Sequence, residues 1–193
     1  MKKIGWILLL FLTACASGNQ TGGSLQAASQ TYSVSSPEQW RRLDTNKYLI
    51  FTREGAFQQY ILIQQRPVDR PFKHTKRLFD REMLPQEAAA VIIDEIISDR
   101  AVLHFKVIEN APTVVNSYDG FKMVFTYRNE EGLTFKTIYY GFLRGEWFYS
   151  LRYNAAQDHY SEKDVHAFEK VVESFHIDES QSASVHGPAS AGS

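Results

Sequence analysis

Three consecutive segments in the second half of the chain alternate apolar and polar residues. They cover residues 121–128, 133–142 and 146–153, and compact turns at 129–132 and 144–145 separate them. Side chains two residues apart point to the same face of a strand, so this period indicates β-structure. The pattern predicts an antiparallel meander with one face packed and the other partly wet.

Further strands and two helices surround this meander in the sequence. Residues 47–53 and 57–65 predict a hairpin that turns at Glu54-Gly55-Ala56. Apolar residues at helical spacing predict a helix from Pro85 to about Asp99, with proline in its first turn.

Two shorter strands are predicted at 102–108 and 113–117. The final helix is predicted to begin at Ser161, since Ser161 and Asp164 form an S-x-x-D start signal. A sheet with two amphipathic helices gives an α+β fold, in which helices flank an antiparallel β-sheet.

The order of these elements resembles the Mog1/PsbP-type α/β/α sandwich and the small bacterial lipoproteins thought to share it. The resemblance spans residues 32–177 and ends in a helix that runs through Val171-Val172-Glu173-Ser174-Phe175 toward His176-Ile177. It implies a fold that carries no shared catalytic residues and whose known members mostly bind other proteins. A cystatin-like or nuclear-transport-factor-like sheet-and-helix fold is the alternative.

The N-terminus has the pattern of a secretory signal peptide. Lys2 and Lys3 precede an uncharged, mainly apolar run that ends at Leu12. This run is too short to span a membrane stably, because a spanning helix needs about 20 apolar residues.

Leu12-Thr13-Ala14-Cys15 then resembles the lipobox of bacterial lipoproteins. The resemblance implies cleavage between Ala14 and Cys15, with lipid attached to the cysteine thiol. Ala16 in place of aspartate implies sorting to the outer membrane, facing the periplasm, or to the outer face of the cell membrane in a Gram-positive cell. The alternative is a free cysteine beside an ordinary signal peptidase site.

Composition divides the chain into four parts. Residues 1–14 are the predicted signal peptide, and 15–31 are the lipidated cysteine with a flexible tether poor in large apolar residues. Residues 32–178 are the single expected domain, and 179–193, rich in Ser and Ala, are an expected disordered tail.

The sequence offers little catalytic chemistry. One cysteine excludes an intrachain disulfide and a multi-cysteine metal site, and a net charge of -1 gives no support to nucleic-acid binding. Asp158, His159, Asp164 and His166 could approach one another and bind a divalent cation, but no local spacing fixes a third or fourth ligand, so we expect neither a metal nor a cofactor.

Charge is uneven around residues 66–99. Residues 66–81 have a local balance of +4, and 82–99 contain five acidic residues and no basic one. The basic segment could bind anionic lipid or an acidic partner, or it could be a solvated loop fixed to the core by its apolar residues. Its basic residues are Arg66, Arg70, Lys73, Lys76, Arg77 and Arg81.

Aromatic residues crowd the last two segments of the meander. Alternation divides them between two faces, so they either fill cores on both sides of the sheet or form a docking face. They are Tyr139, Tyr140, Phe142, Trp147, Phe148, Tyr149 and Tyr153.

Three functions follow from these patterns. The favoured one is a lipid-anchored, non-enzymatic binding or accessory module of the bacterial envelope, with a protein partner there. The alternatives are a carrier of a small apolar ligand between sheet and helices, and a membrane-anchored, metal-dependent hydrolase.

Overall fold

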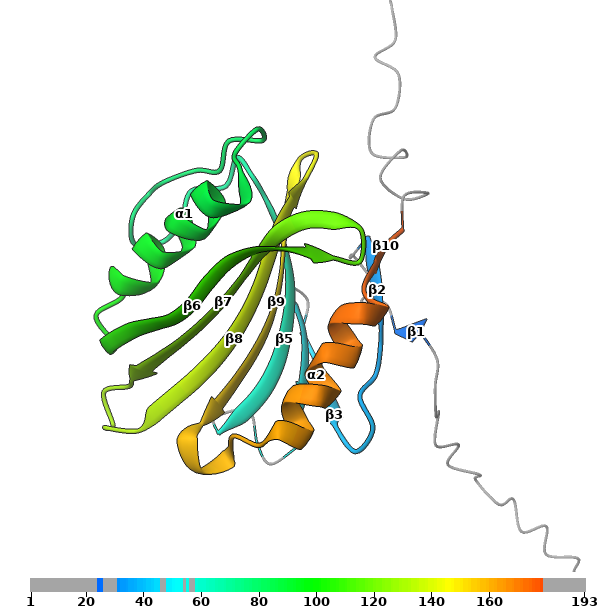
Figure 1. The fold of residues 1–193 in the computed structure, drawn as a ribbon, viewed down its shortest axis with the longest axis vertical. Helices are drawn as coiled ribbons and strands as arrows, with labels where there is room; N and C mark the ends of the chain where they lie inside the picture. The colour runs from blue at the N-terminus through cyan, green and yellow to red at the C-terminus, as the bar shows by residue number, and fades with distance from the viewer. Residues whose placement is uncertain (1–23, 26–30, 46–47, 54, 56–57, 179–193) are drawn as a thin grey trace, which may run out of the picture.

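A computed structural model describes residues 24–25, 31–45, 48–53, 55 and 58–178. They form two antiparallel sheets and two α-helices (Figure 1). The larger sheet has seven strands in the order β3-β4-β5-β9-β8-β7-β6. Its strands are β3 (Arg41–Asp44), β4 (Tyr48–Thr52), β5 (Gln59–Pro67), β6 (Leu103–Val115), β7 (Tyr118–Arg128), β8 (Thr134–Arg144) and β9 (Trp147–Ala156).

The predicted meander is confirmed as β7, β8 and β9, which pair antiparallel in sequence order. Strand β5 pairs with β9 along its full length, so the predicted hairpin β4–β5 extends the same sheet. Of the predicted hairpin turn, residues 54 and 56 lie outside the described residues.

The region before the meander differs from its prediction. Residues 103–115 form one long edge strand rather than two short ones, and Ser117 lies in a turn rather than in a strand. Asn116 and Ser117 both have positive φ, which is the backbone of a two-residue hairpin turn that matches the twist of its strands. The edge strand carries register shifts near His104 and Ile108, and the His104 side chain is exposed.

The smaller sheet joins the two ends of the domain. It consists of β1 (Ser24–Leu25), β2 (Tyr32–Ser35) and β10 (His176–Ile177), with β2 in the middle. The last helix therefore ends at Ser174, and the chain then pairs with β2 instead of remaining helical.

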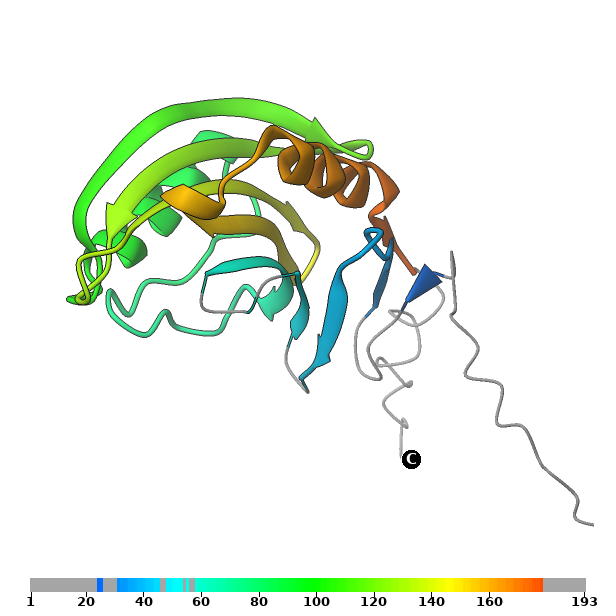
Figure 2. The same ribbon diagram turned by 90° about the horizontal axis from the view of Figure 1, so that it is seen from below.

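Helices α1 (Pro85–Ile97) and α2 (Glu162–Ser174) pack on opposite faces of the seven-stranded sheet. Helix α1 packs against β6, β7 and β8, whereas α2 packs against β2 and β9. Figure 2 shows that the sheet is strongly curved, with β6 and β7 arching over the rest of the domain. The expected class, an antiparallel sheet flanked by helices, is confirmed.

Each face of the sheet has its own core. Phe142, Tyr149 and Tyr153 pack toward α2, whereas Tyr139 and Phe148 pack toward α1. All five are buried, and Tyr140 and Trp147 are half-buried against the α2 side. The aromatic residues of β8 and β9 are therefore core residues of two faces rather than a docking face.

Gly141 is needed where these aromatic residues meet. A Cβ atom at this position would lie 2.6 Å from Cζ of Phe121 and 2.8 Å from Cζ of Phe148. Real Cβ atoms do not approach other atoms so closely, so any side chain here must push the rings apart.

We expect Gly141→Ala to lower the free energy of unfolding by about 1–3 kcal/mol, because the added methyl group overpacks the core. Denaturant unfolding of the protein measures the change. Glu131→Ala, at an exposed position of the β7–β8 turn, is the control and should change stability by no more than about 0.5 kcal/mol. Equal stability of both variants would contradict this role of Gly141.

Candidate functional site

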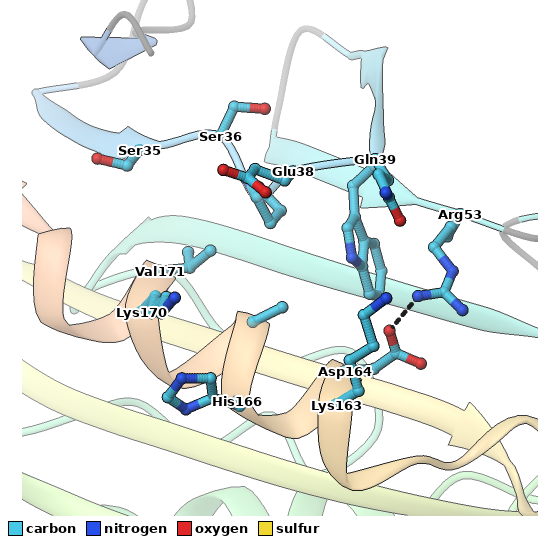
Figure 3. A pocket seen from close by; sticks show the side chains of 13 residues that line it. Ser35, Ser36, Glu38, Gln39, Arg53, Lys163, Asp164, His166, Lys170 and Val171 are labelled. Atoms are coloured by element: carbon cyan, nitrogen blue, oxygen red, sulfur yellow. Dashed lines mark hydrogen bonds and ion pairs between the residues drawn. The ribbon is translucent and has the colours of Figure 1, made fainter. Parts of the chain in front are cut away.

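A pocket of about 320 Å³ lies between α2 and the segment that links β2 to β3 (Figure 3). One wall is the exposed side of α2, and the other is the turn around Glu38 and Gln39. Gln39 has a φ of 65°, a left-handed conformation that turns the chain toward β3. The lining residues are Ser35, Ser36, Pro37, Glu38, Gln39, Trp40, Arg53, Lys163, Asp164, His166, Ala167, Lys170 and Val171.

Asp164 forms the floor of one end of this pocket. Its Oδ1 accepts a hydrogen bond of 2.7 Å from Nη1 of Arg53, and its Oδ2 accepts one of 3.0 Å from Nε2 of Gln59. The Asp164 side chain is only 3% exposed, against 28% for Arg53. A buried carboxylate needs such partners, because leaving it unpaired would cost several kcal/mol.

The same carboxylate also fixes the start of α2. Ser161 is the N-cap residue, and its Oγ both accepts from the backbone N–H of Asp164 and donates to Oδ2. The predicted S-x-x-D start signal is thus confirmed. Gln59 Nε2 also lies 3.1 Å from the hydroxyl of Tyr153 and 3.1 Å from the carbonyl of His159. This network ties the beginning of α2 to β5 and β9.

The mouth of the pocket is cationic. Arg53 and Asp164 neutralise each other, which leaves Lys163 and Lys170 of α2 opposite Glu38. Charged groups of this kind suit a polar or acidic segment of a partner better than an apolar small molecule. The carrier alternative expects an apolar pocket between the sheet and a helix. Buried core side chains occupy that space in the described residues. The pocket beside α2 lies elsewhere and has a charged lining.

The four residues considered for a metal lie around the start of α2. Asp158 and His166 are exposed and His159 is half-buried, while the nearby carboxylate of Asp164 is already bonded to Arg53 and Gln59. Within the part of the chain that the structure describes, no group of three or more His, Cys, Asp or Glu side chains is placed to hold a metal ion.

The basic segment 66–81 folds back onto α1 and pairs with its acidic residues. Arg77 forms an ion pair with Asp94, and Glu95 accepts hydrogen bonds from the backbone N–H groups of His74 and Thr75. Much of the local charge of this segment is therefore balanced within the domain.

Two further basic side chains of the segment are also held. The Arg81 guanidinium pairs with Glu146, and that of Arg66 lies 3.8 Å from the ring centroid of Phe72. Phe72 and Phe79 are buried in the α1 core with their rings edge to face, as expected for a loop fixed to the core by its apolar residues.

Arg70, Lys73 and Lys76 remain exposed at the tip of the segment. Arg77 and Arg81 are exposed too but are ion-paired, whereas these three form no ion pair with another described residue. Beside them, a shallow hollow of about 460 Å³ is lined by Arg77, Asp80, Glu82, Met83, Glu87 and Ala90.

Ala14 and Cys15, the predicted cleavage and lipidation residues, lie outside the described residues. Among the residues that are described, no helix combines the length and the apolar character needed to cross a membrane.

Comparison with known proteins finds likeness in structure only. No protein-family model and no curated sequence matches the chain. Cyanobacterial PsbP (CyanoP) from Synechocystis sp. PCC 6803 superposes with a TM-score of 0.59 at 9% identity, covering 84% of this chain and 95% of that chain. The fold is the PsbP/Mog1 fold.

Two other solved structures support the same assignment. LpqN of Mycobacterium tuberculosis, described as involved in cell envelope biogenesis, matches with a TM-score of 0.53 at 11% identity over 81% of this chain and 90% of that chain. A point mutant of the protein Mog1 matches with a TM-score of 0.52 at 10% identity over 81% and 96%. The cystatin-like and nuclear-transport-factor-like alternatives are therefore set aside.

Sequence reasoning missed the pocket and the residues that build it. Asp164 was identified as part of a helix start and as one of four residues that could approach a cation, and nothing in the sequence linked it to Arg53, which lies 111 residues away. The one available signal was Gln59, a polar residue at a position where the alternation of β5 predicts a buried side chain.

We expect Asp164→Asn to lower the free energy of unfolding by about 2 kcal/mol, because it removes the charge that Arg53 and Gln59 solvate. Denaturant unfolding at neutral pH gives the value. Asp158→Asn, on the exposed turn before α2, is the matched control and should have almost no effect. An equal loss of unfolding free energy in both variants would contradict a stabilising role of the Asp164 network.

Proposed function

We propose that the protein is a lipid-anchored accessory module of the bacterial envelope that binds another envelope protein and catalyses no reaction. The single observation that carries the anchor is the run from Lys2 to Cys15, in which a short apolar stretch ends in a lipobox-like sequence. Two or three acyl chains on Cys15 would hold the chain stably in a membrane.

The structural likeness supports a role in the envelope. LpqN shares the fold and is described as taking part in cell envelope biogenesis. The PsbP/Mog1 fold itself hosts no common catalytic site, so a binding function is the simpler proposal for this chain. With Ala16 after the cysteine, we propose the outer membrane of a Gram-negative cell, facing the periplasm, or the outer face of a Gram-positive cell membrane.

We further propose that the pocket beside α2 receives the partner. Lys163, Lys170 and Glu38 offer charged contacts around its mouth. An acidic segment of a partner would fit this charge. The exposed tip formed by Arg70, Lys73 and Lys76 is the second candidate surface, for anionic lipid or an acidic partner.

The prediction for the anchor is direct. Cys15→Ser should abolish incorporation of a labelled fatty acid and leave the precursor uncleaved by the lipoprotein peptidase, because the acyl acceptor is lost. Metabolic labelling and membrane fractionation measure both effects. Ser17→Ala is the control and should be labelled like the unaltered chain. A Cys15→Ser protein that still carried the label would contradict the anchor.

The prediction for the partner uses crosslinking in intact cells. A photoreactive residue in place of Lys170 should give one reproducible adduct with another envelope protein, and the same residue in place of Glu131 should not. Adding Lys163→Glu should weaken the adduct about tenfold, because it reverses a charge at the pocket mouth. Equal adducts from both positions, or none from Lys170, would contradict docking in this pocket.

A further inference from the structure

Strand β9 presents a polar row in the middle of the sheet. Ser150, Arg152 and Asn154 alternate with the apolar side chains of the α2 core and point to the face on which α1 packs. Register places Tyr139 opposite Arg152, and Thr137 opposite Asn154. Ser150, Asn154 and Thr137 are all buried, which is unusual for three neighbouring polar residues in a sheet.

The uncharged members of this row satisfy one another. Asn154 Oδ1 accepts hydrogen bonds of 2.7 Å from Thr137 and 3.2 Å from the hydroxyl of Tyr127. Burial raises the pKa of Tyr139, and the neighbouring Ser150 side chain opposes that shift. None of these groups forms a hydrogen bond with Arg152, although the phenols of Tyr127 and Tyr139 interact with it electrostatically.

Arg152 itself forms no hydrogen bond or ion pair with another described residue, and its electrostatic neighbours are the phenols of Tyr60, Tyr127 and Tyr139. Its Nε atom is buried and makes no hydrogen bond, and no carboxylate of those residues forms an ion pair with it. Its guanidinium lies 5.4 Å from the ring centroid of Tyr60. Buried charges in proteins are normally paired, so an unpaired guanidinium on a sheet face is unusual.

The Arg152 side chain is not sealed off from solvent. Arg152, Tyr60 and Tyr127 are each half-buried. Helix α1 packs over β6, β7 and β8, and Phe79 covers Phe148 of β9, whereas Arg152 lies four residues further along β9.

We propose that Arg152 is the anchor of a binding site for the carboxylate group of a small organic acid, with Tyr60 and Tyr127 beside it. A guanidinium presents paired N–H donors whose geometry matches the two oxygens of a carboxylate. One guanidinium balances the single charge of that group, whereas a phosphate dianion would call for a second cation.

The surrounding phenols suit an anion. Burial raises the pKa of Tyr127 to about 12 and raises the pKa of Tyr139, so both hydroxyl groups keep their protons at neutral pH and do not repel a carboxylate. The Tyr60 hydroxyl makes no hydrogen bond to other described residues and is available as a donor.

The test compares two probes of the same shape. Benzoate carries the carboxylate, and benzamide is its neutral counterpart. Titration of the protein with each, followed by the Arg side-chain Nε–H resonances in NMR, should show a saturating shift of the Arg152 signal with benzoate. We expect benzamide to bind at least about tenfold more weakly, because it lacks the charge.

Variants then assign the site. Arg152→Gln should weaken benzoate binding at least about tenfold, Arg152→Lys should weaken it less, and Arg128→Gln, at an exposed arginine of β7, should leave it unchanged. Thermal unfolding checks that each variant is folded. If an Arg152 variant does not fold, the comparison of benzoate with benzamide on the unaltered protein tests the site.

Four results would overturn the proposal. They are no saturable shift with benzoate up to about 50 mM, equal binding of benzoate and benzamide, unchanged binding in Arg152→Gln, and tighter binding of phenyl phosphate than of benzoate. The last result would assign the site to phosphate instead.

Discussion

Strands β8 and β9 supply aromatic side chains to both faces of one sheet, so the two cores depend on the register of the same pair of strands. Phe142 and Tyr149 stack toward α2 with ring centroids 5.2 Å apart, while Phe148 on the other face stacks on Phe79 at 4.3 Å. A slip of one residue in either strand would exchange the contents of both cores at once. This constraint explains why the sheet can carry a helix on each side.

Helix α2 adds a second constraint, because it is placed by charge as well as by apolar packing. Phe168 and Phe175 bury the inner face of the helix, but the position of its first turn is fixed by the Asp164 network. The same network forms the floor of the pocket. Stability and the shape of the candidate binding surface therefore rest on the same few side chains.

Much of the fold could be predicted from local pattern, and the rest depends on contacts that pattern does not contain. The meander and both helices repeat over many residues, whereas β2, β3 and β10 have four residues or fewer and acquire their pairing from distant segments. The basic segment was visible as charge, but its ion pairs with α1 depend on how the loop folds back. The polar row on β9 was visible in principle, since Ser150, Arg152 and Asn154 alternate with apolar residues.

Both edges of the large sheet are built in ways that discourage strand exchange between molecules. Strand β3 is short and offers few groups for pairing. The long strand β6 bears exposed apolar residues at Ile108 and Val114, which would favour pairing with a second chain if β6 were a regular strand. Two register shifts distort β6, and Pro112 supplies no N–H to a neighbouring strand. Copies of this domain concentrated on one surface could therefore stay separate without growing into a continuous sheet.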